Sequence, residues 1–575
     1  MPTSSKTFLS IVDASGPFFL EKEEGTTNWS KAPIAKLEKG SKLSRKKHKK
    51  VRKSFQVYAK RVSDLGFNSI SLDELCYLVA HPFYPELLKK KIHGYQKKYK
   101  KLFSIARKSG LNVFLTTDFL PLNESLRIQT DGKLPACRKV FAESLKQVFE
   151  RFPDVQGVIL RIGESDGVDV QKEFKSKLLI RKPEDARQLL LEILPIFEQY
   201  KKTLVFRTWT LGAYAIGDLI WNKSTYKKVF RGIKSKSLVV SMKYGEGDFF
   251  RYMELNPLFF EDGLPKLLEL QARREYEGFG EFPSFVGWQY ENYKNRLLAN
   301  ASSDLIGISV WTQTGGWSSF QNITFLKNSS FWNELNSLVS VRMFSKNWSV
   351  EKCIGKFWGK ENLPKFLEFL RLSDQVIEHL LYDPEFARLT LYFHRVRIPP
   401  LIHITWDKVT VSEPFRLLTQ TFVKDRNKSL ELGKNALDSL LKMGELSKEI
   451  GIPFDFRFQY DTFQLILLCR KMMYENNPAR YLELYEEAIL LSSIYHDQYP
   501  KAYKFRFFPS GSKPKTWMKI VLRMFLRKKR SYRWVDLILF HPLLKKIYYY
   551  AYLKLRKKLP AFLNAQAMPI SELLC

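Results

Sequence analysis

LNVFLTTD (residues 111–118) and VQGVILRIGE (155–164) are two short apolar runs, and CRKVFAESLKQVFERF (137–152) lies between them. The two runs have the length and the β-branched content of strands. The segment between them places apolar residues at the i, i+3, i+4 and i+7 positions of an amphipathic helix. A strand, a helix and a second strand in this order predict a parallel βαβ unit.

The same alternation continues on both sides of this unit. No GxGxxG or GxxxxGK[ST] pattern follows any of the strand-like runs, and a doubly wound sheet typically has fewer strands. Eight runs separated by helical segments therefore predict a (β/α)₈ barrel. The other six runs are TFLSIVD (7–13), FNSISLD (67–73), TLVFRTW (203–209), SLVVSMK (237–243), KLLELQ (266–271) and LIGISVW (305–311).

Beyond residue 340 the alternation gives way to helical periodicity, as in NKSLELGKNALDSLLKMGELSKEI (427–450). We predict three regions: a catalytic barrel over 1–340, an α-helical domain over 341–505 and a basic, aromatic-rich region over 506–575. The five cysteines form no CxxC pair and the eight histidines form no HExxH motif. This pattern indicates reduced thiols in an intracellular protein, and we expect neither a metal site nor a cofactor.

The formal net charge of +35 raises the question of an anionic partner. The sequence does not favour nucleic acid as this partner, because no DNA- or RNA-binding motif occurs and the run RKKHKKVRK (45–53) fits the solvated start of a helix. The N-terminal residues lack a secretory signal pattern, and no apolar run is long enough to span a membrane. We therefore expect a cytoplasmic protein.

Residues 513–558 contain 15 Lys and Arg and a single acid, Asp536, a net charge of +14. Aromatic and aliphatic residues alternate with these cations, which is typical of helices that lie in a membrane interface. The sequence thus predicts peripheral attachment to the inner face of an anionic membrane. The alternative is an ordinary basic helical subdomain that packs on the barrel.

In (β/α)₈ barrels the functional residues lie at the C-terminal ends of the strands. Here every strand-like run ends in a charged or hydrogen-bonding residue. For Asp73 and Asp118 the alternative is a helix N-cap. The residues at or just beyond the ends are Asp13, Asp73, Asp118, Glu164, Arg207, Trp209, Lys243, Gln271, Trp311 and Gln313.

The segment SMKYGEGDFFRYMELNPLFFEDGLPKLLELQARREYEGFGE (241–281) concentrates carboxylates beyond the sixth and seventh strands. Asp248 and Glu275 lie on these loops, and Glu164 follows the fourth strand. Cleavage of a glycosidic bond needs two carboxyl groups that flank the bond, and we expect aromatic rings that stack on the sugar. The segment supplies both kinds of side chain. We expect its glycines, Gly245, Gly247, Gly278 and Gly280, to let the backbone approach a ligand.

Around these carboxylates we predict a set of substrate-binding residues. Arginine is favoured for a substrate carboxylate because its guanidinium binds in a bidentate manner. The alternative is that the cations neutralise the protein's own acids and that the tryptophans belong to the core or the rim. The predicted residues are Arg161, Arg207, Trp209, Lys243, Gln271, Tyr276, Trp288, Trp311, Gln313 and Trp317.

The order GDFFRYMELNPLF (247–259) then PKLLELQARREYEG (265–278) resembles the catalytic segment of the α-glucuronidases, glycoside hydrolase family 67. The segment from GISVWTQTGGW (307–317) into a helical region is similar in layout to that family. The resemblance covers roughly residues 150–370. Asp248 and Glu275, 27 positions apart, match the family's two carboxylates that activate water, and Glu164 in GESDG is nearest to its general acid.

The resemblance implies an inverting glycoside hydrolase acting on a glycan that carries an anionic, uronic-acid-type sugar. Glu164 then protonates the leaving oxygen, with Asp166 as a competitor for that role. A catalytically inactive barrel that serves as a carbohydrate-binding or scaffold protein is the alternative.

Overall fold

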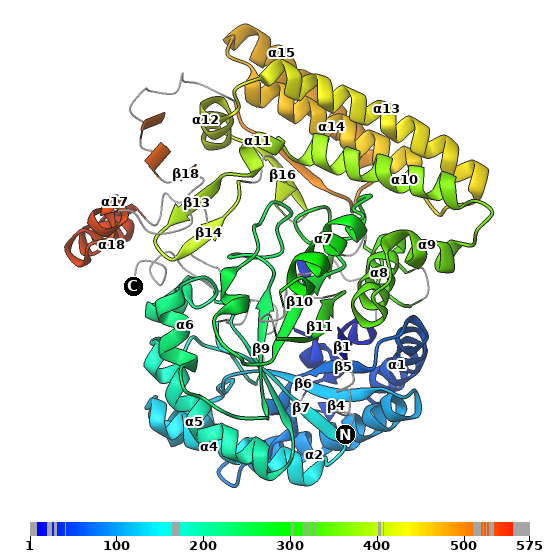
Figure 1. Ribbon diagram of the computed structural model, residues 1–575. Helices are drawn as coiled ribbons and strands as arrows, with labels where there is room; N and C mark the ends of the chain where they lie inside the picture. The colour runs from blue at the N-terminus through cyan, green and yellow to red at the C-terminus, as the bar shows by residue number, and fades with distance from the viewer. Residues whose placement is uncertain are drawn as a thin grey trace.

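A computed structural model (Figure 1) describes residues 8–19, 26–27, 31–40, 42–163, 173–210, 212–300, 304–313, 317–318, 321–326, 329–400, 404–405, 407–509, 519–520, 523–524, 526–527 and 534–555. Its N-terminal part is a closed barrel of eight parallel strands, which confirms the predicted fold. The strands, in chain order, are β1 (Leu9–Asp13), β5 (Ser69–Asp73), β6 (Asn112–Asp118), β7 (Val155–Arg161), β8 (Thr203–Arg207), β9 (Leu238–Lys243), β10 (Lys266–Gln271) and β11 (Leu305–Trp311).

The first strand closes the barrel by pairing with the last, with Leu9 of β1 opposite Gly307 of β11. On its other side β1 pairs with β5, with Ile11 opposite Ser69. Inside the barrel, apolar side chains form a separate packed core, so the barrel is not a pore. This core contains Ile11, Phe114, Ile159, Val205, Val239 and Leu267.

Amphipathic helices surround the strands. The first, α1 (Arg45–Leu65), begins at the N-cap Ser44, whose side chain accepts a hydrogen bond from the Lys47 amide. Its basic first turns are largely exposed, while Phe55 and Tyr58 are buried against the barrel. The run RKKHKKVRK is therefore a helix start, as predicted. The other barrel helices include α2 (Glu86–Lys108), α4 (Leu134–Arg151), α5 (Pro183–Gln199), α6 (Lys223–Phe230), α7 (Gly287–Leu298) and α8 (Phe331–Lys346).

A layer of helices lies over one side of the barrel (Figure 1). It contains α10 (Leu363–Val376), α13 (Arg426–Ile450), α14 (Phe456–Tyr474) and α15 (Pro478–Gln498). Short strands also occur here, among them β13 (Thr390–Phe393), β14 (Val396–Ile398), β16 (Lys408–Val411) and β17 (Lys504–Phe507). With three or four residues each, they are too short to show a strand period in the sequence.

The helical layer contacts the long loop between β10 and α7. Arg251 forms ion pairs with Glu277 of that loop and with Asp374 of α10. Gln459 of α14 donates to the carbonyl oxygen of Glu281, and Tyr503 donates to that of Gly278. The loop that carries Glu275 is thus held between the barrel and the helices.

Candidate active site

Asp248 lies on the loop after β9 and accepts three hydrogen bonds. Lys243, the last residue of β9, forms an ion pair with Oδ1, and the Phe249 amide donates to the same oxygen at 2.9 Å. The hydroxyl of Tyr276 donates to Oδ2 at 2.8 Å. These three donors fix the orientation of the Asp248 carboxylate.

Glu275 lies four residues beyond β10 and is buried. Its backbone amide donates to Oε1 of Gln271 at 3.0 Å, which fixes the start of the loop. Burial, followed by the negative charge of Asp248, raises the pKa of Glu275 to about 8. At neutral pH this carboxyl group therefore carries a proton.

Tyr276 directly follows Glu275 in the chain and donates its hydroxyl proton to Asp248. Burial, followed by the charge of Asp248, raises the pKa of the Tyr276 phenol well above its usual value. The loop after β10 thus places a buried acid with a raised pKa and a hydrogen-bond donor to Asp248 at adjacent positions.

Aromatic rings lie beside Lys243 and Asp248. The Lys243 ammonium lies 3.6 Å from the ring centroid of Trp209 and 4.1 Å from that of Phe249. Trp209, Phe249, Tyr276 and Asp248 are half-buried, so part of each faces accessible space. A partly open carboxylate flanked by aromatic rings offers both polar and apolar contacts to a ligand.

A second cluster of charges occupies the ends of β5, β6 and β7. Arg161 lies 2.6 Å from Asp118 and 3.1 Å from Glu74, and Lys31 also pairs with Asp118. Burial, followed by the charge of Asp118, raises the pKa of Glu74 to about 8. Asp73 accepts the Ala32 amide at 2.7 Å. The alternative that Asp73 and Asp118 cap helices is wrong, because the next helices begin at the N-cap residues Glu74 and Asn123.

Arg207, the last residue of β8, pairs with an acid of β10. Its Nε and Nη2 donate to the two carboxylate oxygens of Glu269 at 2.9 and 2.8 Å. Trp311 donates to the same carboxylate at 3.2 Å, and both partners of the ion pair are buried. Arg161 and Arg207 thus pair with the protein's own acids, which favours the neutralisation alternative over a bound substrate carboxylate.

The remaining predicted residues fall into different places. Gln313 is buried and accepts the Thr324 amide, and its backbone amide donates to Asp13 at 3.1 Å. Trp288 contacts Phe285, with its ring centroid 5.8 Å from Arg371 of α10. Glu164, Asp166 and the side chain of Trp317 lie outside the described residues.

The glycines of segment 241–281 pack closely against neighbouring side chains, and the expectation that they admit a ligand stays a prediction. A Cβ on Gly245 would lie 2.4 Å from Met253, and one on Gly278 would lie 2.2 Å from the ring of Phe282. Gly278 also has a φ of +84°, in the region that glycine favours.

Sequence reasoning missed two acids that organise the site. Glu269, within β10, pairs with Arg207 inside the barrel, and a charge within the apolar run KLLELQ was the available signal. Glu277 is fully buried and bridges Arg251 and Arg274. Nothing in EYEGFG distinguishes Glu277 from Glu275.

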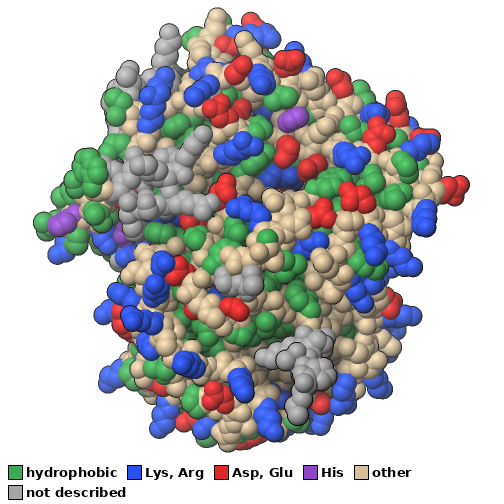
Figure 2. Space-filling view, viewed as in Figure 1, with side chains coloured by type: hydrophobic (Ala, Val, Ile, Leu, Met, Phe, Trp, Pro, Cys, Tyr) green, Lys and Arg blue, Asp and Glu red, His purple; other side chains and the backbone are tan. Residues whose placement is uncertain are grey.

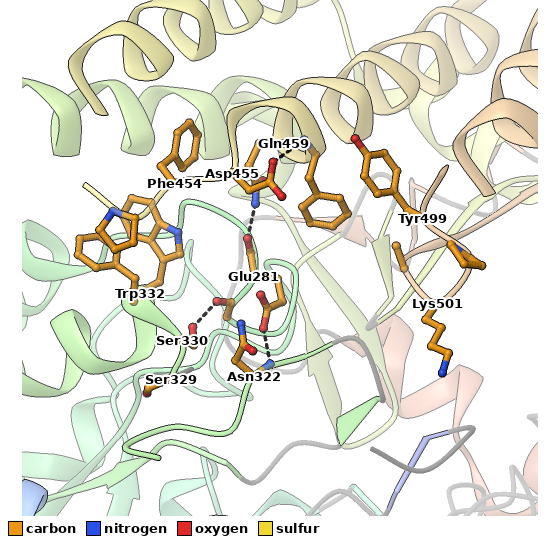
Figure 3. Close-up of a pocket in the computed structure, with 16 residues that line it drawn as sticks. Glu281, Asn322, Ser329, Ser330, Trp332, Phe454, Asp455, Gln459, Tyr499 and Lys501 are labelled. Carbon is orange, nitrogen blue, oxygen red and sulfur yellow. Dashed lines mark hydrogen bonds between the residues drawn. The ribbon is translucent and has the colours of Figure 1, made fainter. Parts of the chain in front are cut away.

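A cavity of about 610 Å³ lies between the β10–α7 loop and the start of α14 (Figure 3). Glu281, Trp332, Phe454 and Tyr499 line it, and it includes neither Asp248 nor Glu275. The described residues contain no group of three His, Cys, Asp or Glu side chains placed to hold a metal ion.

No protein-family model matches this chain, and no curated protein matches its sequence. Similar solved structures are glycoside hydrolases. A family 138 enzyme targeting pectin rhamnogalacturonan II is 11% identical with a TM-score of 0.49, over 86% of this chain and 63% of that protein. CpGH84B is 10% identical with a TM-score of 0.39, over 85% and 74%. A family 5 enzyme from Prevotella bryantii B14 is 10% identical with a TM-score of 0.33, over 60% and 98%.

The chain spans 63% of the length of the family 138 enzyme. At these identities and scores, none of the three proteins identifies a reaction or a substrate for this chain.

Proposed function

We propose that this protein is a glycoside hydrolase whose working pair is Asp248 and Glu275. The observation that carries the proposal is the interaction of Glu275 with Asp248, on the loops after β10 and β9. Burial and the charge of Asp248 raise the pKa of Glu275 to about 8, and the neighbouring Tyr276 hydroxyl donates to Asp248 at 2.8 Å. Two interacting carboxyl groups, one of them with a raised pKa, are typical of acid–base catalytic sites.

In the proposed reaction, Asp248 is the general base. Lys243 and the Phe249 amide hold one of its oxygens in place. A half-buried carboxylate can remove a proton from a water molecule as that water attacks the sugar carbon. Glu275, which carries its own proton, orients the same water.

The general acid of the proposal is Glu164, on the loop after β7. This assignment rests on the motif resemblance to the α-glucuronidases, with Asp166 as the competitor. The same resemblance supports inversion at the sugar carbon. In an inverting enzyme the acid and the base lie about 6.5–9.5 Å apart, which leaves room for the water. The product anomer, followed by NMR in the first minutes of hydrolysis, tests this step.

We propose that the substrate is a glycan with an anionic sugar, and this proposal again rests on the motif resemblance. Arg161 and Arg207 are already paired with acids, so the contact to a sugar carboxylate would have to come from elsewhere in the mouth. Trp209 and Tyr276, both half-buried beside Asp248, are the proposed stacking platforms. A panel of aryl α- and β-glycosides, with uronides and their neutral counterparts, tests both points.

The second candidate is a catalytically inactive barrel that binds glycans. Glu275→Gln separates the two, because it removes the titratable group and keeps the shape of the side chain. A hydrolase loses turnover and retains glycan binding in this variant. If the wild-type protein binds glycans and hydrolyses none of an oligosaccharide panel, the binding function replaces the proposed one.

A further inference from the structure

Two helices near the C-terminal end of the described chain, α17 (Trp534–Leu539) and α18 (Pro542–Leu555), project from the side of the molecule (Figure 1). Large exposed hydrophobic side chains concentrate on them, and green side chains gather at this projection in Figure 2. Single exposed apolar residues are ordinary, whereas a contiguous group marks an interaction site. The group, here called the α17–α18 surface, is Trp534, Leu537, Ile538, Leu543, Ile547, Tyr549, Tyr550 and Leu553.

The other side of α17 anchors the pair to the protein. The Phe540 ring centroid lies 5.5 Å from Phe393 and 5.1 Å from His394, and Asp536 is buried. In contrast, Trp534 is 74% exposed and Tyr550 is 69% exposed. The contacts of Phe540 and Asp536 hold this end of α17 against the protein, so the exposed apolar residues face outward. Apolar side chains are ordinarily buried, because burial removes their surface from water.

Basic residues accompany the apolar ones. On α18, Lys546 and Lys554 are exposed and Lys545 is half-buried. The one acid among residues 513–558 is Asp536, and its side chain is turned to the protein interior. The α17–α18 surface therefore combines apolar side chains with positive charge and presents no exposed carboxylate.

The two helices are too short to cross a bilayer. At 1.5 Å per residue, the 14 residues of α18 extend about 21 Å, against about 30 Å of hydrocarbon. More generally, no helix among the described residues has both the length and the apolar character that a membrane crossing requires.

We propose that the α17–α18 surface docks on an anionic lipid membrane and lies in its interface. The apolar rings and aliphatic chains enter the boundary between headgroups and acyl chains, and the lysines pair with anionic headgroups. A second copy of this chain fits the surface less well, because two molecules of net charge +35 repel each other. The inference is independent of the proposed hydrolase activity.

Co-sedimentation of the full chain with lipid vesicles tests the proposal. Vesicles of phosphatidylcholine alone are compared with vesicles that also contain phosphatidylglycerol, at low and high salt. We expect binding to the anionic vesicles that weakens as salt rises, since surface charges are screened over about 10 Å at 0.1 M salt. Lys545→Glu/Lys546→Glu is expected to weaken it about fivefold or more for each lysine removed.

The apolar contribution is tested by Leu543→Ser/Ile547→Ser, at positions that are 64% and 60% exposed and whose change does not open the core. Its matched control is Ile489→Ser/Leu490→Ser, at exposed positions of α15. Lys46→Glu/Lys47→Glu in α1 controls for net charge, because it changes the charge equally at another exposed site.

We expect both α18 variants to lose binding and both controls to keep it. Three results overturn the proposal. They are equal binding of the α18 variants and the wild type, failure of the wild type to bind either vesicle, and a concentration-dependent dimer that the α18 variants abolish without any lipid binding.

Discussion

The hydroxyl of Tyr276 donates to Oδ2 of Asp248 at 2.8 Å. The charge of the same Asp248 also helps to raise the pKa of Glu275, which precedes Tyr276 in the chain. If the chain acts as we propose, Tyr276 positions the general base, so catalysis depends on the phenol hydroxyl even though it forms no bond to the sugar.

Tyr276→Phe tests this dependence. The ring remains, so its packing 4.3 Å from Phe250 is retained, and only the hydrogen bond to Asp248 is lost. We expect kcat to fall about tenfold or more, with an altered pH–rate profile. Tyr252→Phe is the control, because its hydroxyl contacts Glu378 of the helical layer instead. An unchanged kcat and profile for Tyr276→Phe would show that this hydrogen bond does not position the base.

The carboxyl groups themselves are tested by Asp248→Asn and Glu275→Gln. Both amides keep the size of the side chain, so urea unfolding is expected to show folded proteins. Because general-base catalysis contributes roughly 10²- to 10⁴-fold, kcat/KM should fall within that range for Asp248→Asn. Near wild-type rates for both variants on a genuine substrate would remove these residues from the mechanism.

A third prediction concerns the pH dependence of stability. The pKa of Glu275 is raised from 4.5 to about 8 in the folded protein. Between these values the folded state holds a proton that the unfolded chain has lost, so the free energy of unfolding decreases as pH rises. The slope is about 1.4 kcal/mol per pH unit for this one group.

Glu275→Gln should therefore flatten the decrease between pH 5 and pH 8, as measured by urea unfolding at a series of pH values. Glu74→Gln is expected to act in the same direction, because the pKa of Glu74 is also raised to about 8. Parallel curves for the wild type and Glu275→Gln would show that Glu275 ionises normally.

The sequence predicted the barrel well because each strand is a short apolar run that ends in a charged or hydrogen-bonding residue. The structure has a strand in each of the eight runs, with ends that differ by at most three residues. Asp248 and Glu275 were accessible to the same reasoning, since both follow strand ends. The ion-pair and hydrogen-bond partners of the acids could not be predicted in this way. Whether Arg207 faces a ligand or Glu269 depends on side-chain direction across the barrel, and that direction is set by packing between strands distant in sequence.

The Arg207–Glu269 pair gives a fourth prediction. Arg207→Met leaves Glu269 as a buried charge without its ion-pair partner; Trp311 and Ser241, among the described residues, still donate hydrogen bonds to it. We expect a loss of about 3–5 kcal/mol in the free energy of unfolding, because breaking a buried ion pair leaves one buried charge without its counter-ion. Arg207→Met/Glu269→Gln should recover part of that loss. A variant that is equally stable but has a higher KM would instead assign Arg207 to the substrate.

The last prediction separates two roles for Gly278, which lies three residues beyond Glu275. A glycine that admits a ligand can be replaced by alanine with full stability and weaker binding. Gly278 has a φ of +84°, and an added Cβ would lie 2.2 Å from the ring of Phe282, itself packed against Tyr503 and Phe463. A left-handed conformation costs about 1–2 kcal/mol for a residue with a Cβ, and the contact adds to that cost.

Gly278→Ala should therefore lower the urea midpoint, by an amount that corresponds to at least about 2 kcal/mol. Gly263→Ala is the matched control, because a Cβ there has no neighbour within 4 Å and its φ lies outside the left-handed region. Equal midpoints for the two variants, together with weaker glycan binding by Gly278→Ala, would restore the ligand-approach role. Since the same loop carries Glu275, a packing role also predicts that kcat falls along with stability.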